Sequence, residues 1–301
     1  MFTLAASPIE HIINHKALEI GGWWVWTANQ TNIVIAAVLL IVLGMYVANK
    51  IGTGPESEGN DRYLAKNSFA SMIEVIAIYL RDEMVKPLLG ERTKTFMPFL
   101  WALFFFILMN NLLGLVPLLD LNMLFNHFTG GDMHTAWIGG TATQSIYVTG
   151  ILALVAGLVI NIAGIKELGI GGYLKHLTAD APVALWPLMV TIEVAGIFIK
   201  PVALAIRLFA NMTAGHTLVA TLLMFAGAGI VMLLEKGNVL GAPISLVSAI
   251  GVIAIYFLEL FVAFLQAFVF MFLTAVFISM LSHHGDHDHE HDDHHTHAHA
   301  A

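Results

Sequence analysis

The stretch Pro182–Leu234, PVALWPLMVTIEVAGIFIKPVALAIRLFANMTAGHTLVATLLMFAGAGIVMLL, decides the fold. It is apolar almost throughout, yet it holds ionisable and amide side chains at Glu193, Lys200, Arg207, Asn211 and His216. A second apolar run, Ala242–Leu281, holds Glu259 and Gln266. A charge in hydrocarbon costs roughly 2.5–3.5 kcal/mol on insertion scales, so charges kept inside such helices indicate a function.

The composition is that of a membrane protein. Of the 301 residues, 58% are hydrophobic and only 11% are charged, whereas soluble domains carry about 25% charged residues. The chain has no cysteine, which excludes disulfides, a thiolate nucleophile and cysteine metal sites. The net charge is −8, and no basic surface indicates nucleic acid as a partner.

Five apolar runs predict five membrane crossings. They are Ile33–Ala48, Phe96–Leu119, Ser145–Ile165, Pro182–Leu234 and Ala242–Leu281. Because about 20 residues cross a bilayer, the fourth run must be strongly tilted, broken or partly outside the hydrocarbon. We therefore expect an all-α polytopic membrane protein, in which the short turn Glu235–Gly241 joins the last two helices into a long tilted hairpin.

Positive charge predicts the orientation of the chain in the membrane. The connection Asn49–Thr95 holds seven Lys and Arg residues, whereas Leu118–Gln144 holds none. Basic connections stay in the cytoplasm, so we expect the N-terminus outside and the C-terminus in the cytoplasm.

The same basic connection contains an amphipathic pattern. Its apolar residues recur at helical spacing, at Phe69, Met72, Ile73, Ile76 and Leu80. We expect an amphipathic cytoplasmic helix that lies on the membrane or a partner, or else packs on its own membrane domain.

The polar residues of the fourth run form a stripe. At about 100° per residue, Glu193, Lys200 and Asn211 fall within about 40° of Arg207. His216 falls on the opposite face of the helix.

Counting outward from the predicted turn relates this helix to the next one. His216 and Glu259 lie at similar depth, and Gln266 lies near the depth of Arg207 and Asn211. The hairpin therefore predicts a His–Glu pair at one level and an Arg–Asn–Gln group about two turns away.

These residue types suit proton transfer. A histidine and a carboxylate in a wet membrane crevice can each gain and lose a proton, whereas arginine stays charged. Arg207 would act as an electrostatic gate that repels hydronium and holds a carboxylate deprotonated. Glu193 is roughly 21 Å away along the same helix, so we expect the carboxylate partner of Arg207 on another subunit.

Three segments resemble subunit a of F-type ATP synthases. They are KPVALAIRLFANMTAGH at Lys200–His216, LQAFVF at Leu265–Phe270, and the helix ending Asn110–Pro117. The resemblance covers most of Phe96–Ser282, and the N-terminal third is similar mainly in layout. It implies one transmembrane ion-channel domain over residues 1–282. That domain would lie beside a rotating ring of c subunits and couple proton flow through two offset aqueous half-channels to ATP synthesis.

The resemblance also implies roles for individual residues. Arg207 matches the arginine that separates the half-channels, with Asn211 and Gln266 beside it. His216 and Glu259 match a pair in the outer half-channel, which the family presents in either order and this chain presents with histidine first. Two further carboxylates match the family, Glu193 toward the inner exit and Asp120 near the outer channel, although the local register around Asp120 differs.

Partners and location follow from the same resemblance. It implies a c-subunit ring, a b-subunit peripheral stalk, the remaining F1Fo subunits and the lipid bilayer, in a bacterial inner membrane. The chain has no Gly-rich Lys-Ser/Thr phosphate loop, so we expect a non-catalytic subunit without a cofactor.

Plainer interpretations stand beside these roles. Arg207 could be structural, Lys200 could snorkel to the interface, and His216 with Glu259 could be a static salt bridge. Asn211 and Gln266 could form simple interhelical hydrogen bonds, and Glu193 could be an interfacial carboxylate with no proton role.

Two other functions are consistent with a polytopic membrane chain. A standalone proton- or metal-linked secondary transporter predicts internal repeats, and we find none in the sequence. A non-conducting assembly subunit leaves the polar stripe unexplained.

The segment 283–301 is a His/Asp-rich tail with nine of the 15 histidines. Its composition predicts disorder. Its imidazoles are candidate metal ligands, at His283, His284, His287, His289 and His291. A solvated, pH-responsive tail is the alternative.

Overall fold

The computed structural model describes residues 16–20, 23–50, 67–116, 142–177, 185–234 and 237–282. The chain divides into two compact units. Unit 1 comprises Met1–Met45, Phe105–Thr149 and Ile206–Ala267, and unit 2 comprises Tyr46–Phe104, Gly150–Ala205 and Phe268–Ala301. The boundaries between the two units fall within the long helices, so each long helix contributes residues to both units.

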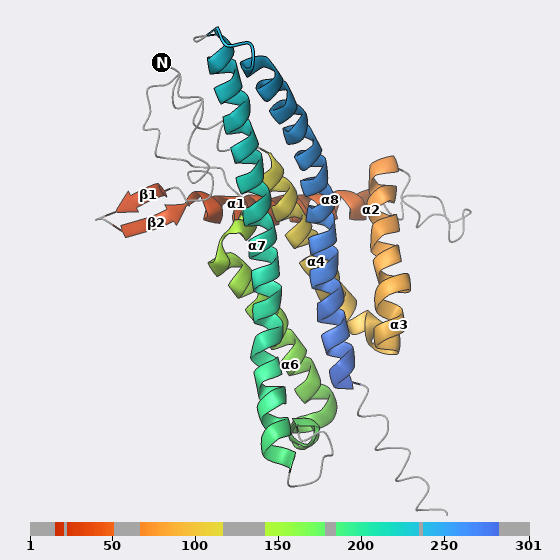
Figure 1. Ribbon diagram of the computed structural model, residues 1–301. Helices are drawn as coiled ribbons and strands as arrows, with labels where there is room; N and C mark the ends of the chain where they lie inside the picture. The colour runs from red at the N-terminus through yellow and green to blue at the C-terminus, as the bar shows by residue number, and fades with distance from the viewer. Residues whose placement is uncertain are drawn as a thin grey trace, which may run out of the picture. The chain divides into compact units, whose positions relative to one another are not determined.

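The helical prediction is confirmed. The long helices are α1 (Ala28–Lys50), α4 (Thr93–Leu115), α6 (Ile146–Leu177), α7 (Trp186–Leu234) and α8 (Gly241–Ser282) (Figure 1). Five helical stretches among the described residues are long and apolar enough to cross a membrane.

Helix α7 is one continuous helix of 49 residues, so the alternative of a broken fourth span is wrong. At about 1.5 Å per residue it is roughly 73 Å long, against a hydrocarbon core of about 30 Å. It must therefore tilt or extend beyond the hydrocarbon.

Unit 1 begins with a β-hairpin that the sequence pattern did not indicate. Strands β1 (Lys16–Ile20) and β2 (Trp23–Thr27) pair antiparallel. The Trp26 indole Nε1–H donates to Thr31 Oγ1 at 2.7 Å, and the Thr27 backbone N–H donates to Gln30 Oε1 at 2.9 Å. These bonds satisfy donors at the start of α1.

The turn between α7 and α8 follows from two residues. Gly237 has φ 62°, a left-handed conformation that glycine adopts without strain. The Asn238 side-chain oxygen accepts from the Leu240 backbone N–H at 3.0 Å, and its carbonyl accepts from the Gly241 N–H at 3.0 Å. A glycine and an asparagine thus end one long helix and start the next.

Unit 2 contains the predicted amphipathic segment. It consists of α2 (Ser68–Tyr79), the π-helix η2 (Leu80–Val85), α3 (Lys86–Leu89) and the 3₁₀ turn η3 (Gly90–Arg92), which leads into α4. The Asn67 side chain caps α2 by accepting from the Phe69 backbone N–H at 3.0 Å.

This segment packs on the chain's own membrane helices, as one of the two alternatives predicts. The Trp101 indole N–H donates to the Ala77 carbonyl at 3.0 Å, and the Ser279 hydroxyl donates to the Leu88 carbonyl at 2.8 Å. The buried face coincides with the predicted stripe only in part. Leu80 is buried, whereas Phe69 and Met72 are about half exposed, because α2 carries apolar residues on several faces.

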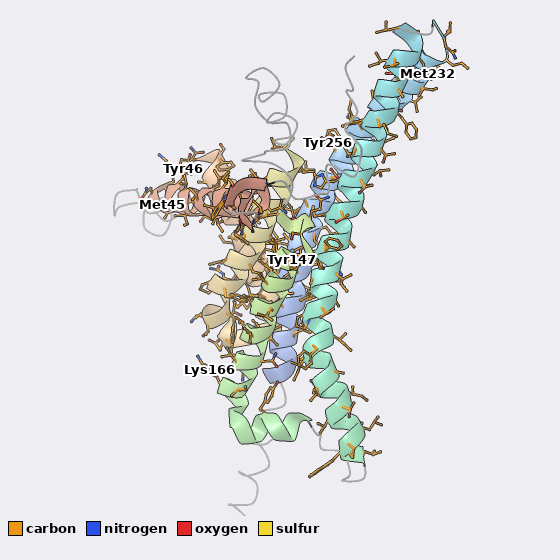
Figure 2. All side chains as sticks on the ribbon, turned by 90° about the vertical axis from the view of Figure 1, so that its left-hand side faces the viewer. Met45, Tyr46, Tyr147, Lys166, Met232 and Tyr256 are labelled. Atoms are coloured by element: carbon orange, nitrogen blue, oxygen red, sulfur yellow. The ribbon has the colours of Figure 1, made fainter. Side chains whose placement is uncertain are left out.

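Helices α6 and α7 also approach closely within unit 2. A Cβ at Gly157 would lie 2.7 Å from Pro201 Cγ, so only glycine fits there. Beyond this contact, α6 bends at Gly169, which has φ 67° and ψ 168°, and a short second segment follows (Figure 2).

Candidate functional site

The candidate site is built on the α7–α8 hairpin of unit 1 (Figure 1), in which contacts fix the register. A Cβ at Gly229 would lie 3.0 Å from Ser245 Cβ and 2.7 Å from the Gly241 carbonyl oxygen. Figure 2 places Met232 close to this end of the hairpin. One to two turns further along, a Cβ at Gly251 would lie 3.4 Å from Leu222 Cδ1.

In the same register, the Glu259 side chain of α8 lies against Gly215 of α7. A Cβ on Gly215 would overlap the Glu259 Oε1 and would lie 3.1 Å from its Cδ. The glycine therefore leaves the space that the carboxyl group fills. His216 follows Gly215 directly and is half-buried, so Glu259 and His216 lie at similar depth, as the count from the turn predicts.

The Glu259 carboxyl group is buried on this hairpin. The residue is only 7% exposed, and its Oε2 has no hydrogen-bond partner among the described residues. Buried polar atoms are almost always hydrogen-bonded to protein or water. An unpaired carboxyl oxygen inside a membrane protein is therefore suited to bind water or to exchange a proton.

Gln266 and Asn211 lie further from the turn. Continuing the register by seven residues from Gly215 and Glu259 brings Leu208 level with Gln266. Gln266 is 6% exposed, and neither its Nε2 nor the Asn211 Nδ2 has a hydrogen-bond partner among the described residues. Neither amide nitrogen therefore donates an interhelical hydrogen bond to a described residue.

Arg207 is exposed, unlike Glu259 and Gln266, and the next residue along α7, Leu208, is fully buried. Within the described part of the chain, no carboxylate lies within salt-bridge distance of its guanidinium group.

A buried polar layer beside α8 was missed at the sequence level. Asn111, at the end of α4, donates from Nδ2 to the Ala263 carbonyl at 3.3 Å and accepts from the Thr143 hydroxyl at 2.9 Å. Thr143 lies in the short 3₁₀ turn η4 (Ala142–Gln144), and all three of its residues are buried. Ala263 lies one turn from Glu259, so this layer adjoins the carboxyl group. Two consecutive asparagines, Asn110 and Asn111, within an apolar run could have indicated this buried polar layer.

Glu193 and Lys200 belong to unit 2 and lie together. Lys200 Nζ is 3.8 Å from Glu193 Oε1 and 5.4 Å from the centre of the Phe277 ring. Both charged side chains are about one-third exposed. Lys200 therefore contacts a carboxylate and an aromatic ring of its own chain. These contacts are compatible with a position of its ammonium group at the membrane interface.

A tyrosine missed by the sequence analysis lies near Glu193. The Tyr173 hydroxyl donates to Asn161 Oδ1 at 2.7 Å. Burial raises the pKa of the Tyr173 hydroxyl, and the negative charge of Glu193 raises it further. A carboxylate, an ammonium group, a phenol and an amide thus gather in one part of unit 2.

Several predicted residues lie outside the described residues. They are Asp120 and the tail histidines His283, His284, His287, His289 and His291. Among the residues that are described, no group of three His, Asp or Glu side chains is arranged to hold a metal ion.

Comparisons with known proteins agree with the resemblance. A family model described as ATP synthase A chain matches residues 30–279. An ATP synthase subunit a of Chloroherpeton thalassium is 35% identical over 92% of this chain and 72% of its own length. An ATP synthase subunit a 2 of Chlorobaculum tepidum is 36% identical over 89% and 67%. An ATP synthase subunit a of Myxococcus xanthus is 40% identical over 75% and 66%.

Proposed function

The chain belongs to the ATP synthase A chain family, and from this premise we propose how it conducts protons in the membrane sector, Fo. Two offset aqueous half-channels lead from opposite membrane faces to the carboxylates of a rotating c-subunit ring. The chain is the stationary subunit that loads and unloads those carboxylates. It performs no bond chemistry on a nucleotide, and ATP synthesis takes place on other subunits.

The observation that carries this proposal is the exposure of Arg207 on an apolar helix. A guanidinium group in hydrocarbon costs at least about 2.5 kcal/mol, and no described carboxylate offsets that cost. A carboxylate presented by another subunit would remove the penalty on each encounter. A fixed positive charge also repels hydronium, so protons cannot pass Arg207 without binding to a ring carboxylate.

The surface around Arg207 suits a close neighbour. Ala203, Ala210 and Ala214 lie near it on the exposed side of α7. Small side chains let helix backbones approach closely within a membrane. A ring helix could therefore bring its carboxylate within reach of the guanidinium group.

The buried groups of unit 1 suit the outer half-channel. Glu259 has an unpaired oxygen and lies level with His216, and the Asn111–Thr143 layer begins one turn away. Water along these groups would carry protons to the level of Gln266 and Asn211. Their unpaired amide donors would then orient the arriving carboxylate beside Arg207.

The cluster in unit 2 suits the inner exit. Glu193 accepts a released proton there, and Lys200 Nζ lies 3.8 Å from its carboxyl oxygen. The rest of the assembly comprises the b-subunit peripheral stalk and the F1Fo subunits, in a bacterial inner membrane. The basic connection Asn49–Thr95 supports an orientation with the N-terminus outside and the C-terminus in the cytoplasm.

ATP-driven acidification of inverted membrane vesicles tests the role of Arg207. We expect Arg207→Ala to abolish pumping while the complex assembles normally, because the gate charge is lost. The matched control is Arg81→Ala, which removes an arginine paired with its neighbour Asp82 at 2.9 Å on η2, and it should retain pumping. Pumping by an assembled Arg207→Ala complex would refute the gate.

A further inference from the structure

A groove between the start of α4 and α6 is lined by none of the residues that we assign to proton transfer. It belongs entirely to unit 2 and has a volume of about 340 Å³. Its polar end is formed by Arg92, Thr95 and Lys166. Among the described residues that line this α4–α6 groove, none is acidic.

The rest of the groove is apolar. Phe96 lines it from α4, and Val159, Ile162 and Ala163 line it from α6. With Lys166, the three α6 residues recur at helical spacing, so they share one face of the helix. Val159 lies roughly 10 Å along the axis from Lys166, so the apolar wall continues away from the cationic end.

The cationic end lies where α4 begins and where the straight part of α6 ends. Lys166 is the last residue of the membrane-spanning stretch Ile146–Lys166, and Figure 2 shows it near the end of the straight part of α6. Arg92 directly precedes α4. Both therefore lie at the end of their helices that the basic connection places at the cytoplasmic leaflet.

We propose that the α4–α6 groove binds an anionic phospholipid of the cytoplasmic leaflet. Arg92 and Lys166 hold the phosphodiester headgroup, and the Thr95 hydroxyl donates to one of its oxygens. An acyl chain lies along Phe96, Val159 and Ile162. Basic pockets between membrane helices are suited to anionic headgroups, and the apolar wall adds affinity that a free phosphate would not gain.

The bound lipid would join two segments that are distant in sequence. Arg92 is the last residue of the amphipathic segment, and Lys166 precedes the bend at Gly169. A single headgroup bridging them would stabilise the cytoplasmic end of unit 2. This inference does not depend on the proposed proton path.

Photo-crosslinking on the purified intact complex tests the groove. The probe is phosphatidylglycerol with a diazirine in its acyl chain, and labelled peptides from α4 and α6 are quantified by mass spectrometry. Each cation near a headgroup contributes about a fivefold gain in binding, so we expect labelling by limiting probe to fall about 30-fold in Arg92→Gln/Lys166→Gln. Lys166→Gln alone, at an exposed position, should lower it about fivefold.

The matched control is Lys86→Gln/Lys94→Gln. It removes two exposed cations from the same part of the chain, and neither lines the groove. Labelling should be unchanged in this control and should be competed by unlabelled phosphatidylglycerol. Equal loss in the control would mean that general surface charge attracts the lipid and would overturn the proposal. Equal competition by phosphatidylcholine, or by soluble glycerol phosphate, would overturn it in favour of a nonselective lipid contact or a small-anion site.

Discussion

Gly215→Ala offers the sharpest test of the hairpin geometry. An alanine Cβ would overlap the Glu259 Oε1 and would lie 3.1 Å from Cδ and 3.2 Å from Cγ. Overpacking of this kind costs about 1–3 kcal/mol, so the carboxyl group must move. A displacement on the order of 1 Å at a reacting group can cost up to about 100-fold in rate. We therefore expect ATP-driven proton pumping per assembled complex to fall at least roughly 10-fold.

The control for this change is Gly227→Ala on the same helix. Beyond the adjacent backbone of its own helix, a Cβ there would have no atom within 4 Å. Replacing glycine by alanine inside a helix also favours the helix by about 1 kcal/mol. Pumping should therefore persist. The double variant Gly215→Ala/Glu259→Asp shortens the crowded side chain and should recover part of the lost pumping. Equal pumping in Gly215→Ala and Gly227→Ala would refute the placement of Glu259 against α7.

Two further changes probe the packing around the same site. Gly229→Ala should destabilise the hairpin by about 1–3 kcal/mol, because its Cβ would lie 2.7 Å from the Ser245 backbone nitrogen. The measurement is the midpoint temperature for thermal dissociation of the complex. Equal midpoints for Gly229→Ala and Gly227→Ala would contradict this prediction. Asn111→Leu removes two hydrogen bonds from the buried layer and leaves a buried hydroxyl without its acceptor, at about 1–3 kcal/mol. ATP-driven proton pumping by vesicles should fall together with the stability of the complex. Unaltered stability and unaltered pumping would exclude a role for this buried layer.

The helical architecture could be predicted because hydrocarbon thickness and hydrophobic length determine it. Each predicted span corresponds to a helix, and the α7–α8 register followed from counting residues outward from one short turn. That count placed Glu259 at the depth of His216, and the contact of Glu259 with Gly215 agrees with it. Depth along a straight helix depends only on the number of residues from the turn, so sequence distance is sufficient to predict which residues lie at the same depth.

Lateral neighbours could not be predicted in the same way. The bond from Asn111 to Ala263 joins residues that are 152 apart in sequence, and no periodicity reports such a contact. The packed side of the amphipathic segment could not be chosen from the sequence, because Phe69, Met72 and Leu80 are all apolar, although only Leu80 is buried. The β1–β2 hairpin was missed because a tryptophan cluster suits both a strand and a membrane interface.

The Glu193–Lys200 pair allows a structural role to be separated from a role in proton transfer. Either Glu193→Gln or Lys200→Gln removes the same 3.8 Å ion pair. A partly exposed pair contributes at most about 1 kcal/mol, so both variants should lose the same small amount of stability. Only Glu193→Gln removes a group that can accept a proton. If Glu193 is part of the inner exit, Glu193→Gln should pump less than Lys200→Gln at equal assembly. If both variants pump equally, whether normally or poorly, Glu193 acts only through the ion pair and the inner exit lies elsewhere.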